Sequence, residues 1–188
     1  MPPREKPPAR RAGPSAVDAD GRTHAGRLRL SRLIPREVSL REHPDHHDAE
    51  LLLRLYDLRR EERLREAREW FMREMKMESA QDFSTRVPRG SREHALYRMV
   101  TSYWEMAASL VSRGLISEDL FFENTGELWI VWQKIKHLAP STRETLKNPY
   151  YWQNLETVAD RFEKWMNKRA PEAIDALRQV VMGTPPPK

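Results

Sequence analysis

Cysteine is absent from this chain of 188 residues. Its absence excludes disulfide bonds, thiolate zinc sites and cysteine nucleophiles together. Glycine is scarce: seven glycines are scattered along the chain, and neither of the common glycine-rich phosphate-binding patterns occurs. No apolar run of about 18 residues is present, and no apolar stretch follows the basic N-terminus as it would in a secretory signal. The sequence therefore predicts no membrane span, and we expect a cytoplasmic protein.

Net charge is confined to the beginning of the chain. Residues 1–42 carry ten Arg and Lys against five Asp and Glu, a net charge of +5, whereas residues 43–188 carry 23 of each sign. This asymmetry predicts a basic tail that meets an acidic partner. The balanced charge of the remainder gives it no general preference for nucleic acid.

We expect residues 1–45 to form a basic arm rich in proline and arginine. Its first half has too few apolar side chains to offset the entropy of ordering, so it should be disordered alone. Its second half, residues 27–40, alternates Arg with Leu. Either this half packs on its own domain, or it orders when it binds a partner. The predicted partner-binding residues are Arg10, Arg11, Arg27, Leu28, Arg29, Leu30, Arg32, Leu33 and Ile34 of the arm, with Tyr150 of the folded part.

Apolar residues recur at helical spacing from about residue 47 onward. This pattern predicts a single all-α domain over residues 46–183, an irregular bundle of five to seven helices, followed by a frayed tail at 184–188. Residues 47–76 form either one helix or two helices with a break near residues 60–62. Residues 78–91 interrupt the period and are expected to be a connection.

Several residues predict where the helices begin and end. Asp45, Ser91 and Ser117 are expected to be N-caps, and Gly114 suits the left-handed position that follows a helix. Residues 141–144 fit a capping box. The pair at residues 148–149, Asn followed by Pro, predicts the start of another helix with proline at its first position. A last helix is expected over residues 171–182.

The aromatic residues favour a core position. Five of the six tryptophans lie between residues 92 and 165, and we expect Trp132 and Phe162, each on the apolar face of a helix, to be buried. The consecutive residues Tyr150, Tyr151 and Trp152 cannot all point inward from one helix, so at least one should face solvent or an interface.

Two groups of residues are candidates for sites of chemistry. The segment 43–48 combines His with Asp, which are metal-ligand types, but no second cluster completes a set of four ligands. Glu105 lies within the most apolar helix, where a buried carboxyl can be functional. More often such a residue faces solvent or pairs with an arginine such as Arg98 or Arg161. We predict no catalytic residue, no metal site and no cofactor.

Four motifs together with two aromatic residues resemble a bacterial family of small helical proteins known as domain of unknown function 4760. They are LYDL at residues 55–58, REAREW at 65–70, LISEDLFF at 115–122 and NPYYW at 148–152, with Phe162 and Trp165. The resemblance spans about residues 48–170. It implies an all-α fold and supplies no catalytic residue. Family members often carry a hydrophobic N-terminal segment, in whose place this chain has its basic arm.

These observations favour a non-enzymatic interaction protein, an accessory subunit that docks on an acidic partner protein through its arm. The alternative is a nucleic-acid-associated protein whose arm arginines neutralise phosphates. A third hypothesis is an enzyme with an unfamiliar helical site, which would show a deep pocket around Glu105 lined by Tyr103 or Trp104. The sequence leaves the oligomeric state open.

Overall fold

The computed structural model describes residues 44–77 and 79–182. Within these residues the fold is all-α, without a strand. The α-helices are α1 (His46–Arg60), α2 (Glu62–Arg73), α3 (Ala80–Arg86), α4 (Arg92–Ser112), α5 (Glu118–Asn124), α6 (Glu127–Ile135), α7 (Ala139–Thr145), α8 (Gln153–Arg169) and α9 (Pro171–Met182), and a 3-10 helix spans Lys136–Leu138. The predicted all-α class is confirmed. The arm, apart from its last two residues, lies outside the described residues, and so does the predicted tail.

The number of helices is higher than predicted, because the described residues hold nine α-helices where five to seven were expected. Residues 79–91 were predicted to be part of a connection, yet α3 forms there, with the Ser79 hydroxyl accepting a hydrogen bond from the Asp82 amide at 3.1 Å. A short polar helix buries too little apolar surface to give a periodic signal, so α3 was missed.

Two predicted helix starts are wrong. Residues 141–144 lie inside α7, which begins at Ala139 with Pro140 in its first turn, so they do not form a capping box. Helix α8 begins at Gln153 and not at Pro149. The Asn148 side chain instead accepts a hydrogen bond from the Tyr150 amide at 3.0 Å, a local turn that competes with helix formation.

The predicted caps that depend on neighbouring residues are confirmed. Asp45, Ser91 and Ser117 each accept a hydrogen bond from the first turn of the helix that follows. Gly114, with φ of +69°, follows α4, and the amide of Leu115 donates to the carbonyl of Leu110 at 2.9 Å. This is the Schellman arrangement, although the Leu115 side chain remains half-exposed.

The segment 47–76 forms two helices that meet at Glu61. Its backbone leaves the helical region, with ψ of 138°, and its carboxylate accepts a hydrogen bond from the Leu64 amide at 2.9 Å. Glu61 therefore ends α1 and caps α2, and this short-range hydrogen bond fixes the break without glycine or proline.

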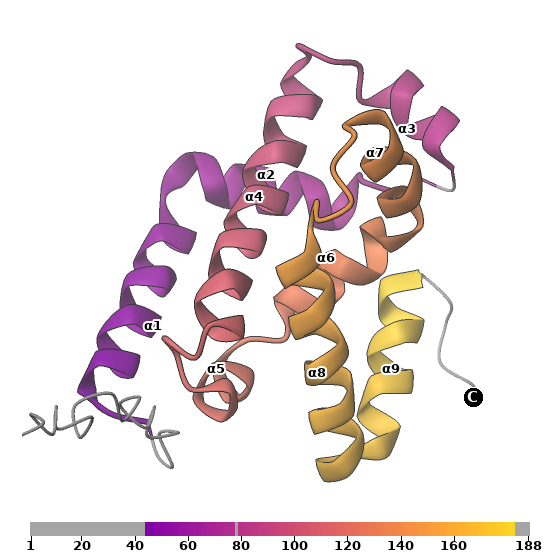
Figure 1. Ribbon diagram of the computed structural model, residues 1–188. Coiled ribbons are helices and arrows are strands. Elements are labelled where there is room, and N and C mark those ends of the chain that lie inside the picture. Colours follow the sequence, from indigo (N-terminus) through magenta and orange to yellow (C-terminus); the bar gives the residue numbers. More distant parts are fainter. Residues whose placement is uncertain (1–43, 78, 183–188) are drawn as a thin grey trace, which may run out of the picture. The chain divides into compact units, whose positions relative to one another are not determined.

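Helix α4 is the central element of the described fold. It packs against α2, α6 and α8, while α8 also contacts α6 and α9 (Figure 1). Helices α8 and α9 follow each other directly and lie side by side. None of the described helices is both long and apolar enough to cross a membrane.

The predicted burial of Trp132 and Phe162 is confirmed. Phe162 of α8 lies edge-on to Phe122 of α5, with ring centroids 5.3 Å apart, and 6.5 Å from Trp129 of α6. This side chain therefore joins three helices that are separate in sequence.

At least three helix ends in the described part of the chain are capped by side chains that other helices supply. Glu105 of α4 accepts hydrogen bonds from the amides of Asn154 and Leu155 in the first turn of α8, at 3.2 and 2.8 Å. Lys134 of α6 donates to the carbonyls of Phe71 and Met72 at the end of α2, both at 2.9 Å.

The third such cap is Asp48 of α1, which is almost fully buried. Its carboxylate accepts a hydrogen bond from the Ser117 amide, before α5, at 2.6 Å. It also accepts one from the Asp45 amide at 2.8 Å, which ties the starts of α1 and α5 together.

We expect Trp132→Ala and Phe162→Ala each to lower the free energy of unfolding by about 3–5 kcal/mol, because each removes a buried aromatic side chain and leaves a cavity. Urea unfolding followed by circular dichroism measures the change. Tyr150→Ala is the matched control, since that ring is 70% exposed, and it should change stability by less than about 0.5 kcal/mol. Equal effects at buried and exposed positions would contradict the assignment of the core.

Candidate functional site

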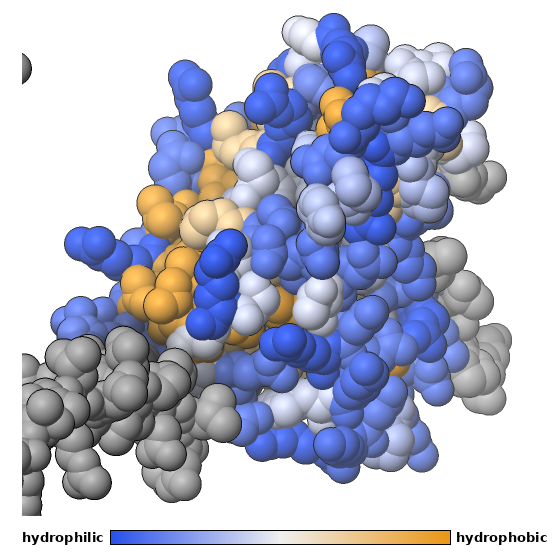
Figure 2. All heavy atoms as spheres, viewed as in Figure 1, coloured by the Kyte–Doolittle hydropathy of each residue, from blue (hydrophilic) through white to orange (hydrophobic). Residues whose placement is uncertain are grey.

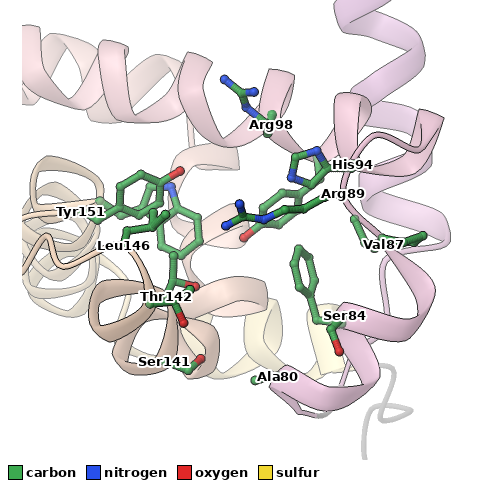
Figure 3. A pocket seen from close by; sticks show the side chains of 15 residues that line it. Ala80, Ser84, Val87, Arg89, His94, Arg98, Ser141, Thr142, Leu146 and Tyr151 are labelled. Carbon is green, nitrogen blue, oxygen red and sulfur yellow. The ribbon is translucent and has the colours of Figure 1, made fainter.

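A large groove lies between α3, the start of α4, α7 and the segment 146–152. Its volume is about 870 Å³. Figure 3 shows its lining, with Ser84 contributed by α3, His94 and Arg98 by α4, and Ser141 and Thr142 by α7. We call this cavity the groove. Its size falls within the ~300–1,000 Å³ that is typical of ligand sites.

The wall of the groove is cationic. Its positive charges are those of Arg89 and Arg98, His94 also lines it, and none of its lining residues in the described chain is Asp or Glu. Arg89 and Arg98 are exposed and form no salt bridge with any described residue. Arginines without an acidic neighbour keep their full charge available for an anion.

The floor of the groove is aromatic. Tyr97 and Trp152 are buried, and Phe83 and Tyr151 flank them. Ring centroids lie 4.7 Å apart for Phe83 and Tyr97, 6.1 Å for Tyr97 and Trp152, and 4.6 Å for Tyr151 and Trp152. The floor thus offers apolar contact area beneath the cationic wall.

Burial raises the pKa of the Tyr97 phenol well above its usual value of 10.0, and Tyr151 raises it further. The phenol therefore stays protonated at neutral pH. Ser84, Ser141, Thr142 and Thr145 add further hydroxyl groups to the lining, so neutral hydrogen-bonding groups accompany the cations.

The segment that leads into α8 is held in a strained backbone conformation. Lys147 and Trp152 have φ of 51° and 59°, in the left-handed region that favours glycine. Such residues cost about 1–3 kcal/mol each and persist where surrounding contacts hold them. One of these contacts is Arg143 of α7, which donates to the Tyr151 carbonyl at 2.9 Å and pairs with Glu156 of α8 at 2.6 Å.

Of the predicted site residues, the structure describes Tyr150 but not the residues of the arm. Tyr150 is exposed, as at least one of the three consecutive aromatics had to be, but it does not line the groove, whereas Tyr151 and Trp152 do. The predicted arm residues Arg10, Arg11, Arg27, Leu28, Arg29, Leu30, Arg32, Leu33 and Ile34 lie outside the described residues. Their role stays a prediction.

Sequence reasoning missed the cationic wall. His94 and Arg98 are one helical turn apart on α4, with Tyr97 between them, and this spacing places all three on one face. Arg89 precedes α4 in the turn after α3. A cationic stripe beside an aromatic residue was a usable signal, but only the position of α7 shows that the stripe faces a cavity.

Glu105 does not pair with Arg98 or Arg161, the arginines expected as its partners, in the described structure. Both of its oxygens accept hydrogen bonds from the start of α8, including one from the Asn154 side-chain amide at 2.8 Å. It lines neither this groove nor the smaller pocket near α1. The structure therefore gives it a capping position.

The His and Asp residues at the start of α1 take part in local contacts. Asp45 and Asp48 form a capping box, and the rings of His46 and His47 are 4.0 Å apart. In the part of the chain that the structure describes, no three His, Asp or Glu side chains come together as a metal site would require. His43 lies outside that part.

Stability at alkaline pH depends on Tyr97. Its pKa is raised in the folded state, so this group stabilises the fold below about pH 10. That contribution is lost as pH rises, because the unfolded chain releases the proton first. We expect the free energy of unfolding to fall more steeply between about pH 10 and 11 in the parent than in Tyr97→Phe, whose ring cannot ionise. Urea unfolding at both pH values tests this, and equal slopes would contradict it.

Comparison with known proteins gives one match. The family model described as domain of unknown function (DUF4760) matches residues 44–165, which is most of the described chain. No curated protein and no solved structure matches. The matched region holds α1 to α7 and most of α8, and therefore the whole groove. This chain belongs to the family of domain of unknown function 4760.

Proposed function

We propose that this protein is a non-enzymatic interaction protein whose groove binds an acidic segment of a partner protein. The observation that carries the proposal is the cationic wall, with Arg89 and Arg98 and no acidic residue among the described residues that line the groove. Arginine forms charge-assisted hydrogen bonds with carboxylates that are about twice as strong as neutral ones. An acidic segment is therefore the occupant whose charge complements the groove.

The aromatic floor supports a segment with one apolar side chain among its acidic residues. Such a side chain would pack on Tyr97 and Trp152 while carboxylates meet Arg89 and Arg98. Aromatic and arginine residues are the types that dominate binding energy at protein interfaces. The strained backbone at Lys147, next to the lining residue Leu146, and at Trp152, in the floor of the groove, also favours a functional site.

The basic arm belongs to the same proposal. Its arginines would speed the encounter with an acidic partner, and its leucines, with Ile34, would prolong the complex. The protein would then be an accessory subunit of a larger cytoplasmic assembly, with the arm and the groove each contacting the partner. The charge distribution along the sequence supports this step.

Nucleic acid is the second candidate partner. Cations above aromatic rings also suit the phosphates and bases of a single strand, and the arm is rich in arginine. Against it stands the balanced charge of residues 43–188, because nucleic-acid-binding domains are usually strongly basic. Competition between oligothymidine and a free acidic peptide distinguishes the two.

A peptide selection tests the proposal. A random peptide library would be selected against the full chain, and the binding of enriched peptides would be measured by fluorescence anisotropy. We expect the enriched peptides to be acidic with a single aromatic or aliphatic residue. The double variant Arg89→Glu with Arg98→Glu should bind them at least about tenfold more weakly, since like charges then face each other.

The matched control is Arg54→Glu with Arg65→Glu, two exposed arginines outside the groove. It makes the same change of net charge and should leave the affinity within about twofold, a difference under ~0.5 kcal/mol. Three outcomes would contradict the proposal: enriched peptides without excess acid, equal losses in the two double variants, or displacement of the peptides by oligothymidine at lower concentration than by a free acidic peptide.

A further inference from the structure

Two hydrogen-bond donors on the floor of the groove have no partner among the described residues. They are the hydroxyl of Tyr97 and the indole N–H of Trp152, residues that are only 5% and 4% exposed. Buried groups of the same kinds elsewhere in the fold are paired. The Tyr103 hydroxyl donates to the Leu55 carbonyl at 2.7 Å, and the Trp129 indole donates to a carboxylate of α8 at 3.0 Å. The two floor donors are therefore free to bind a ligand.

Both floor donors open into the groove. Within the described part of the chain, the unpaired side-chain atoms that are inaccessible to solvent are the Trp104 indole nitrogen and the Thr125 hydroxyl. The polar atoms of Tyr97 and Trp152 are not among them, so they keep accessible surface although the rest of each side chain is buried. Since both residues line the groove, an occupant of the groove can reach these atoms.

An occupant that covers the floor must bring acceptors. It removes the two donors from water, and a buried donor without an acceptor costs about 1–3 kcal/mol. Neither group can become an acceptor-only partner, because burial raises the pKa of the Tyr97 phenol and an indole N–H only donates. A wholly apolar anchor would therefore lose affinity on this floor.

Arg89 brings positive charge to the same space. Figure 3 shows its side chain extending into the cavity, toward the side that Leu146 and Tyr151 form. The rings of Tyr97 and Trp152 are nearly perpendicular, at 77°, so their donors lie in different planes. A phosphate suits donors that approach from several directions, since it has three acceptor oxygens and a charge of about −1.5 to −2 at pH 7. A carboxylate has two oxygens in one plane.

We propose that the floor of the groove binds a phosphotyrosine side chain of the partner segment. The proposal rests on the proposed function, because the acidic segment carries this side chain. The phosphate accepts hydrogen bonds from Tyr97 and Trp152 and pairs with Arg89, while the phosphotyrosine ring packs against Phe83 and Tyr151. One side chain thus supplies both the apolar contact and the acceptors. A phosphoserine would supply the acceptors alone.

Fluorescence anisotropy tests the proposal with one labelled polyglutamate peptide whose central residue is tyrosine, phosphotyrosine or phosphoserine. We expect the phosphotyrosine form to bind the full chain at least about tenfold more tightly than either other form. Tyr97→Phe, which removes only the hydroxyl, should abolish most of this gain. On binding of the phosphotyrosine form, the indole proton of Trp152 should shift downfield in two-dimensional ¹H–¹⁵N NMR.

The matched control is Tyr56→Phe, which removes the hydroxyl of a tyrosine on α1 that does not line the groove. Figure 2 shows hydrophobic side chains gathered over α1, apart from α3 and α7, which line the groove. Tyr56→Phe makes the same chemical change as Tyr97→Phe at a separate place. It should keep the gain from phosphotyrosine within about twofold of the parent.

Three results would overturn the proposal and leave the acidic groove in place. Equal affinities for the tyrosine and phosphotyrosine forms would mean that the phosphate finds no subsite. Equal affinities for the phosphotyrosine and phosphoserine forms would mean that the arginines select charge alone. A Trp152 indole signal that does not move at saturation, or equal gains in Tyr97→Phe and Tyr56→Phe, would mean that the floor donors bind water only. If none of the three peptides bound, the proposed function would fail as well.

Discussion

The carboxylate of Glu105 at the start of α8 is the interaction on which the arrangement of this fold depends. The residue before α8, Trp152, is left-handed and supplies no side-chain cap, so the first amides of the helix need another acceptor. Glu105 accepts from Asn154 and Leu155, the second and third residues of α8, and its negative charge also favours the positive end of the helix dipole. One side chain of α4 thereby fixes where α8 begins.

The same principle recurs at other helix ends. Lys134 of α6 binds the last carbonyls of α2, and burial lowers the pKa of its amino group. Asp48 of α1 binds the amide that precedes α5. Each of these charged groups is partly or fully removed from water, which is tolerated because hydrogen bonds to the backbone compensate its desolvation. The caps therefore specify how helices meet, while the aromatic core supplies most of the burial.

The groove depends on these caps. Trp152 and Tyr151, which line it, lie immediately before α8, so the residue that fixes the start of α8 also fixes part of the aromatic floor of the groove. The cationic wall, with Arg89, His94 and Arg98, is carried by the start of α4 and the turn before it. Since Glu105 also lies on α4, this helix positions both the cationic wall and part of the aromatic floor of the groove.

The features that could be predicted from the sequence are those that depend on residues close together in the chain. The caps Asp45, Ser91 and Ser117 act within a few residues, and the burial of Trp132 and Phe162 follows from helical spacing, so both were predictable. The family was also recognisable, because each of its motifs is a short continuous stretch of the sequence. The start of α8, the capping role of Glu105 and the groove depend on residues about 50 positions apart, and no local pattern encodes them. Helix α3 was missed because it is short and polar.

Amide hydrogen exchange in Glu105→Gln tests the central claim most directly. This substitution keeps the size of the side chain but removes its charge and one acceptor oxygen. We expect the amide protons of Asn154 and Leu155 to exchange at least about tenfold faster than in the parent, equivalent to ~1.4 kcal/mol of local stability. Amides in the middle of α4 should change much less, and Glu93→Gln, at the start of α4, should leave α8 unchanged. Unaltered exchange at Asn154 and Leu155 in Glu105→Gln would contradict the account.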